Sequence, residues 1–119
     1  MTILSHRDLM IWQRSMDLAE TTYGVTDKFP QSEQYGLTSQ MRRAAVSVPS
    51  NIAEGYYRSS SKDYARFLAV AKGSLMELET QAELAMRFNY MSQEQFSAIA
   101  IEIGDIDRMI TSLRSKLRK

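Results

Sequence analysis

Apolar residues recur at helical spacing along four stretches of the chain, and the last stretch is the most regular. Ser92 and Gln95 form a capping box, which marks the start of a helix. The apolar residues that follow are separated by alternating steps of three and four: Phe96, Ile99, Ile103, Ile106, Ile110, Leu113 and Leu117. This spacing places them all on one helix face. The sequence therefore predicts a helix from Ser92 to near the end of the chain.

The first stretch carries two apolar stripes. It is predicted to begin near Ser5, with Asp8 completing a variant capping box, and to end at Phe29-Pro30. The main stripe has the 3-4-3-4-3 spacing of a helix seam: Leu9, Trp12, Met16, Ala19, Tyr23 and Thr26. The second stripe consists of Ile11, Leu18 and Val25. We expect the main stripe, Trp12 included, to face the core and the second stripe to widen that face.

The third stretch predicts a helix from the N-cap Ser60 to about residues 88–90. Its seam consists of Tyr64, Phe67 or Leu68, Ala71, Leu75, Leu78, Ala82 and Ala85. Gly73 in the middle costs roughly 1 kcal/mol relative to alanine, so we expect it to allow close approach of the segment around Pro49. Glu79 and Glu83 are expected to be exposed or to pair with Arg42 and Arg43.

The second stretch, residues 32–55, is unusual because Pro49 interrupts a helical pattern of Leu37, Met41, Ala44, Val48 and Ile52. A proline inside a helix removes one hydrogen bond and kinks the backbone. We expect one helix kinked at Pro49, with Ser47, Ser50 and Asn51 bonding freed backbone groups and a positive-φ end at Gly55. The kink either wraps the helix around the core or displays Asn51, Glu54 and Arg58 as a binding edge.

Four amphipathic helices with short connections predict an all-α fold, an up-down-up-down four-helix bundle that forms a single domain over residues 1–119. Charge is distributed in bands. Residues 1–40 carry a net −2, residues 41–75 carry +4, residues 76–107 carry −6 and residues 108–119 carry +5. This banding favours either a basic face for a polyanion or the pairing of acidic and basic helices within the bundle.

Several classes of function lack their residues. The chain has no cysteine and one histidine, His6, which we expect to be solvated. Di-iron bundles need Glu-x-x-His motifs on two helices, and none is present. The sequence therefore predicts no enzymatic activity, catalytic residue, metal site or cofactor. Neither a membrane-spanning run nor a signal peptide is recognisable, so we expect a cytoplasmic protein with no membrane partner.

Motifs over residues 8–85 resemble those of the 23S ribosomal RNA intervening-sequence proteins, also called the four-helix bundle protein family. The strongest match is the run Leu37-Thr38, Gln40, Arg42 to Ser47, Pro49, Asn51 to Gly55 and Arg58. The resemblance implies a ring-like homo-oligomer, commonly a pentamer. A related protein, the accessory variability protein of diversity-generating retroelements, forms a basic pentamer that partners a reverse transcriptase and nucleic acid.

These observations lead to the expectation of a non-enzymatic oligomer that binds structured RNA, or other nucleic acid, through backbone phosphates. The candidate contacts are Arg42, Arg43, Arg58, Lys62, Arg66 and Lys72. Asn51, Glu54 and Gly55 form the edge that carries the family motif. Tyr56 and Tyr57 either stack on unpaired bases or pack at the corner between the second and third helices. The alternative is a protein-interaction scaffold that makes no contact with nucleic acid.

Overall fold

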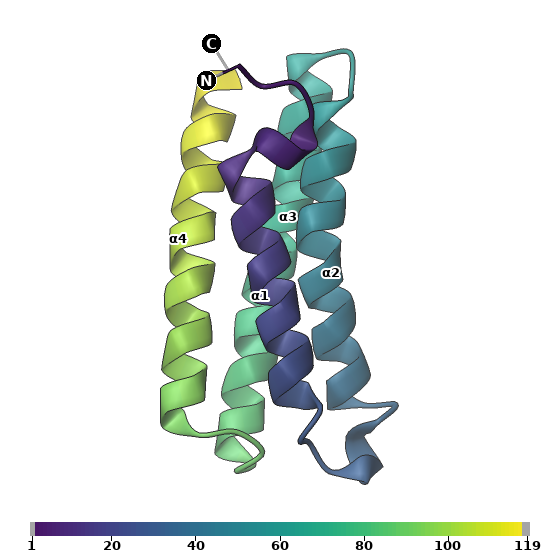
Figure 1. Cartoon of the computed structure of the whole chain (residues 1–119), viewed down its shortest axis with the longest axis vertical. Coiled ribbons are helices and arrows are strands. Elements are labelled where there is room, and N and C mark those ends of the chain that lie inside the picture. Colours follow the sequence, from purple (N-terminus) through teal and green to yellow (C-terminus); the bar gives the residue numbers. More distant parts are fainter. Residues whose placement is uncertain (1, 118–119) are drawn as a thin grey trace.

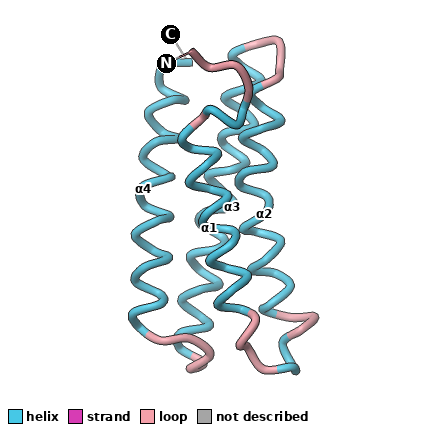
Figure 2. Tube along the Cα trace, in the orientation of Figure 1, coloured by secondary structure: helices cyan, strands magenta, loops and turns pink. Residues whose placement is uncertain are grey.

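The computed structural model describes residues 2–117 and is built from four long helices (Figure 1). They are α1 (Met10–Thr26), α2 (Leu37–Tyr56), α3 (Ser61–Arg87) and α4 (Gln93–Leu117), with two short 3-10 turns, η1 (His6–Asp8) and η2 (Gln31–Glu33). Consecutive helices run in opposite directions, and α4 returns to pack against α1. The predicted all-α four-helix bundle is confirmed. Figure 2 shows the short loops at both ends of the bundle.

The predicted starts of α3 and α4 and the end of α3 are confirmed. The hydroxyl of Ser60 accepts a hydrogen bond from the Asp63 N–H at 3.1 Å. Ser92 and Gln95 exchange hydrogen bonds of 2.9 and 3.0 Å between side chain and backbone. After α3, Asn89 adopts φ 64°, a left-handed conformation that closes a helix end. These local signals are readable from sequence because each depends on a few neighbouring residues.

The predicted start of α1 is wrong. Ser5 and Asp8 do form a capping box, but it closes the separate turn η1. Leu9 is extended between the two elements, and α1 begins at Met10. The short η1 turn therefore lies across the end of α1 instead of forming its first turn.

The core draws on a different face of α1 from the one predicted. Ile11 and Leu18, from the second stripe, are buried. Three polar residues are buried on the same face, and the hydroxyl of each donates to the carbonyl four residues earlier: Ser15, Thr22 and Thr26. Because these hydroxyls are satisfied within the helix, their burial carries little penalty. The prediction that Met16 and Tyr23 face the core is wrong, because both are exposed. Trp12, which was also predicted to face the core, is partly buried and packs against it.

Helix α2 continues through Pro49, whose ring is buried. The Asn51 amide donates to the carbonyl of Ser47 at 2.8 Å and to its hydroxyl at 3.0 Å. The Ser47 hydroxyl in turn lies 2.8 Å from that of Ser74 on α3. Two of the three polar residues expected around Pro49 thus bond as a group, and they also tie α2 to α3. The kink at Pro49 stays a prediction.

The roles predicted for Gly55 and Gly73 are both wrong. No glycine among residues 2–117 has a positive φ, and Gly55 lies within α2. A Cβ on Gly55 would lie 2.7 Å from the Cβ of Phe67, so α2 and α3 approach closely here. A Cβ on Gly73 would meet no atom within 4 Å. The contact between α2 and α3 therefore requires the glycine at residue 55, and Gly73 faces outward.

Replacing Gly55 with alanine should lower the free energy of unfolding by about 1–3 kcal/mol, because the new methyl group forces α2 and α3 apart. Urea unfolding followed by circular dichroism measures this change. Gly24→Ala is the matched control: unlike at Gly55, a Cβ at Gly24 meets open space, and alanine should raise stability by up to about 1 kcal/mol. A Gly55→Ala protein as stable as the parent would contradict the close contact.

Candidate interaction surfaces

The structure distributes the six predicted nucleic-acid contacts over three regions. Arg42 belongs to α2, and its side chain reaches the C-terminal end of α1. There its Nε donates to the Thr26 hydroxyl at 2.9 Å and its Nη2 to the Tyr23 carbonyl at 3.3 Å. Its guanidinium also covers the Tyr23 ring, 4.5 Å from the centroid. A cation at a helix C-terminus is stabilised by the helix dipole. Arg42 therefore holds α1 to α2.

Lys72 is also used within the chain. Its Nζ donates to the Asp107 carboxylate at 2.6 Å and to the Thr111 hydroxyl at 3.2 Å, linking α3 to α4. Arg14 makes a similar link from α1 to the carboxylates of Glu102 and Asp105 on α4, both at 3.0 Å. For these residues, the banded charge reflects pairing between helices.

Arg58, Lys62 and Arg66 lie together at the corner between α2 and α3. The guanidiniums of Arg58 and Arg66 both contact the ring of Phe67, at 4.5 and 4.9 Å from its centroid. Each also has a nearby carboxylate, Glu54 at 2.8 Å for Arg58 and Asp63 at 3.5 Å for Arg66. Both carboxylate pairs are largely exposed, so they contribute little to stability.

Further cations lie at the same end of the bundle. Arg114 on α4 donates to the Ala65 carbonyl of α3 at 3.2 Å. Figure 1 shows that the α2–α3 corner, the last turns of α4 and the turn η1 all lie at one end. We name this region the basic end; its cations are Arg7, Arg58, Lys62, Arg66, Arg114 and Lys116.

Aromatic side chains fill the space beneath the basic end. The rings of Tyr56 and Tyr64 meet edge to face at 6.2 Å, and burial raises the pKa of Tyr64 to about 12. Tyr57 is 60% exposed, and its hydroxyl accepts from the His6 N–H at 3.2 Å. The His6 ring packs edge-on against Trp12 and Tyr57. His6 was expected to be solvated, but it anchors the N-terminal segment to this cluster.

Arg43 lies apart from the other candidate contacts. It is exposed on α2 and lines a polar cleft with Gln40, Ser47 and Glu77. At 1.5 Å per residue, it lies about 20 Å along α2 from the basic end. Of the two alternatives expected for Glu83, the exposed one holds: its side chain is 45% exposed and pairs with Arg87 at 2.7 Å on its own helix.

The edge that carries the family motif is used for contacts within the chain. Asn51 bonds Ser47, Glu54 pairs with Arg58, and Gly55 faces Phe67 of α3. These three residues shape the junction of α2 and α3, and through it they position Arg58.

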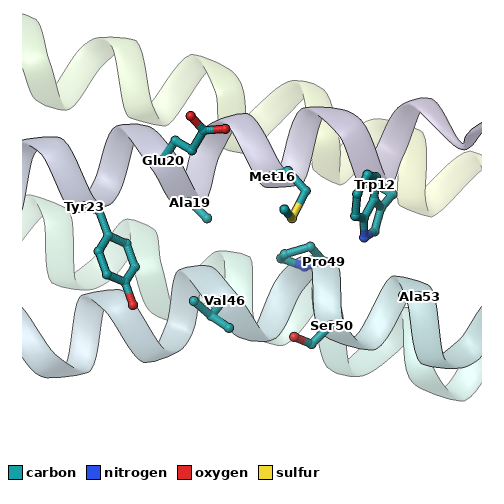
Figure 3. Close-up of a pocket in the computed structure, with 9 residues that line it drawn as sticks. All are labelled: Trp12, Met16, Ala19, Glu20, Tyr23, Val46, Pro49, Ser50 and Ala53. Atoms are coloured by element: carbon teal, nitrogen blue, oxygen red, sulfur yellow. The ribbon is translucent and has the colours of Figure 1, made fainter. Parts of the chain in front are cut away.

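An apolar groove runs along the outside of α1 and α2 (Figure 3). Its lining residues come from both helices: Trp12, Met16, Ala19, Glu20, Tyr23, Val46, Pro49, Ser50 and Ala53. The predicted core stripe of α1 thus forms one wall of a surface groove. Met16, Tyr23 and Val46 remain 38–44% exposed, which is unusual for a contiguous apolar set. The two apolar stripes on α1 were the sequence signal for this groove, because one bundle core cannot bury both and one of them must stay at the surface.

Within residues 2–117, no group of three or more histidine, aspartate or glutamate side chains is arranged to hold a metal ion. No helix in this part of the chain is both long and apolar enough to cross a membrane.

The fold and these surfaces define a four-helix bundle protein with an apolar side groove and a basic end. Residues 7–112 match the model of the 23S rRNA-intervening sequence protein family, and the chain belongs to that family. A crystal structure from Bacteroides thetaiotaomicron, of a protein with unknown function from the S23 ribosomal protein family, is 22% identical. The match covers 88% of this chain and 98% of that chain with a TM-score of 0.82, which shows a shared fold. No curated protein matches this chain.

The link between α1 and α4 should be visible in the titration of Asp105. Its hydrogen bond from Arg14, with a smaller contribution from Arg108, holds the pKa of the Asp105 carboxyl below the ordinary value of 3.8. A carboxyl group whose pKa is lower in the folded state than in the unfolded state stabilises the fold at any pH above its unfolded-state pKa. This stabilisation is lost as the pH falls through the folded-state pKa. Arg14→Gln should therefore raise the Asp105 pKa toward 3.8, measured by NMR titration of the carboxyl group. Arg108→Gln is the control and should raise it less; an equal or larger rise would contradict this ranking.

Proposed function

We propose that the protein is a non-enzymatic, self-associating four-helix bundle that binds structured RNA at its basic end. The observation that carries this proposal is the pair of guanidiniums, from Arg58 and Arg66, that share the ring of Phe67. Lys62 lies one helical turn before Arg66. Like charges repel at this range, so a cluster of three cations favours an anionic partner.

The geometry of the corner suits phosphate. A guanidinium stacked on an aromatic ring keeps its N–H edge free for bidentate contacts, and phosphate oxygens match that edge. The exposed carboxylates of Glu54 and Asp63 compete weakly, because exposed ion pairs are worth about 0–1 kcal/mol. Phosphate groups can therefore replace them without disturbing the packing of α2 on α3.

Tyr57 supports RNA over other polyanions. Its ring is exposed beside Arg58, where an unpaired base can stack on it. Tyr56 is different, because it packs between Tyr57 and Tyr64 inside the corner. In this proposal the contact set narrows to Arg58, Lys62 and Arg66 and gains Lys116. Arg42, Lys72 and Arg114 act between helices.

Binding to structured ribosomal RNA across a salt series tests the proposal. Exchanging both Arg58 and Lys62 for glutamate should weaken binding at least about tenfold and reduce the slope of log affinity against log salt by about 2, since each phosphate contact releases counterions. Arg87→Glu, an exposed cation of α3 far from the basic end, is the control and should bind like the parent. Equal losses in both variants, or no loss in the double variant, would count against the basic end.

A protein-interaction scaffold without nucleic-acid contact is the second candidate, and the apolar groove favours it. Trp and Tyr often supply much of the binding energy at protein interfaces, and Met is enriched there. Trp12, Tyr23 and Met16 lie together in the groove. The same groove supports self-association, for which the family resemblance implies five copies.

Light scattering tests self-association. The double variant Met16→Glu, Val46→Glu should shift the protein from an oligomer to the mass of one chain, because two buried carboxylates oppose an apolar contact. Ile101→Glu is the matched control: Ile101 is 65% exposed on α4, outside the groove, and its substitution should leave the mass unchanged. An oligomer that survives the groove variant would place the contact elsewhere. The two functions are separate if the basic-end variant loses RNA binding but stays an oligomer, or if the groove variant becomes a single chain that still binds RNA.

A further inference from the structure

Gly73 has no explanation within a single copy of the chain. It lies in the middle of α3, where glycine costs about 1 kcal/mol relative to alanine. Its surface is open, since a Cβ there would meet nothing within 4 Å. On the same side of α3, Val70 is 47% exposed and Met76 is 39% exposed. We name this surface, Val70, Gly73 and Met76, the Gly73 face. It combines two apolar side chains with a hollow at the glycine between them.

The Gly73 face and the apolar groove lie on different sides of the bundle. Helix α3 packs against α2 and α4, whereas the groove is formed by α1 and α2. One copy therefore presents two separate apolar surfaces, one concave and one formed by the side of a single helix. A helix seated in a groove between two others is a recurring mode of recognition.

We propose that the Gly73 face of one copy packs into the α1–α2 groove of the next copy. This inference rests on the proposed self-association and specifies the two surfaces that make the contact. Because the surfaces differ, the contact is heterologous, and repeating it closes a ring when the rotation between copies allows. The absent side chain at Gly73 lets α3 approach the groove closely, which gives a physical reason for a glycine at that position.

Hydrogen bonds within one copy fix the heights of the residues along the bundle. Arg42 bonds Thr26, and Ser47 bonds Ser74, so Ser47 and Ser74 lie at about the level of residue 21 of α1. Because α3 runs in the same direction as α1, the same offset applies along both helices. Gly73 then lies at the height of Glu20, Val70 at the height of Asp17 and Met76 at the height of Tyr23. A neighbouring copy placed in parallel and at the same height therefore sets Val70 beside Met16 and Gly73 above Ala19.

Charges favour this parallel register. On α3, Arg66 precedes the Gly73 face and Glu77 follows it. Glu20 lines the middle of the groove, and Arg42 covers the ring of Tyr23, the lining residue of α1 that lies farthest from the basic end. The parallel register brings Glu77 toward Arg42 and leaves Arg66 at the level of residue 13, at the basic end. Inverting the neighbour would bring Arg66 toward Arg42 and Glu77 toward Glu20, so that like charges would face each other.

Cysteine cross-linking tests the contact, since the natural chain contains no cysteine. A disulfide requires Cα atoms about 4–7 Å apart, so it reports a specific juxtaposition. Ser50→Cys places a thiol in the groove, and Val70→Cys places one on the Gly73 face without filling the hollow at Gly73. Both positions are exposed, so neither substitution should disturb the fold. Ala98→Cys, exposed on α4, is the matched control.

Each single-cysteine protein should stay unlinked on mild oxidation, and a mixture of Ser50→Cys with Val70→Cys should form the mixed disulfide. Mixtures with Ala98→Cys should not. A disulfide between two Ser50→Cys chains would overturn the proposal in favour of a groove-to-groove dimer. A yield of mixed disulfide no higher than in the mixtures with Ala98→Cys would also overturn it.

Light scattering of the same proteins separates this inference from the proposed function. An oligomer without the mixed disulfide refutes the Gly73 contact and leaves self-association standing, whereas a single-chain mass refutes both. Gly73→Leu provides a second readout: its side chain meets open space within one copy, so the helical signal should persist while the oligomer dissociates. An oligomer that keeps its mass with leucine at residue 73 would contradict the close approach.

Discussion

The structure depends on a choice between two apolar stripes of α1, because a four-helix bundle can bury only one of them fully. The core takes Ile11 and Leu18, together with three hydroxyl residues whose polar groups are bonded to their own helix. Helix α2 contributes the small residues Ala44 and Ala45 to the core, and both are buried. A close-packed interior accepts serine and threonine at such positions more easily than tryptophan or tyrosine. Met16 and Tyr23 are consequently left exposed, and Trp12 is only partly buried.

The same division applies to the charged residues. Arg14, Arg42 and Lys72 each reach a neighbouring helix, and their acceptors lie on α4 or at the end of α1. Arg58 and Arg66 bond carboxylates one turn away on the surface, and these contacts hold no helices together. Cations that link helices cannot be given up to a ligand without loosening the bundle, whereas those of the corner can. This distinction, rather than net charge, separates structural cations from candidate ligand contacts.

Local sequence signals predicted the helices well and the faces of α1 poorly. Caps such as Ser60 and Ser92 need only a side chain and a nearby N–H, and the isoleucine seam of α4 has no competing stripe, so both were predictable. The orientation of α1 depends on the volume that α2 leaves, which no window of sequence contains. Gly55 and Gly73 show the same limit: both are helical glycines, and only the position of Phe67 on another helix reveals which one is needed for packing.

The candidate site was predictable in part for a related reason. Arg58, Lys62 and Arg66 are close in sequence, and a helix corner necessarily keeps them close in space. Arg42 and Lys72 were indistinguishable from them by composition, because their acceptors, Thr26 and Asp107, are 16 and 35 residues away. Arg114 joins the corner only through the return of α4 to the same end of the bundle.

The positions of the groove and the basic end relate the two proposals. The groove lies along the side of the bundle, and the basic end lies at its tip, so contacts through the groove leave the basic end uncovered. In a ring of parallel copies, every basic end lies on the same face. An RNA that reaches two or more of these ends gains affinity from effective concentration without any new contact. The near-neutral charge of one chain, net +1, is then compatible with RNA binding, because assembly concentrates the basic ends on one face and the acidic residues of 76–94 toward the other.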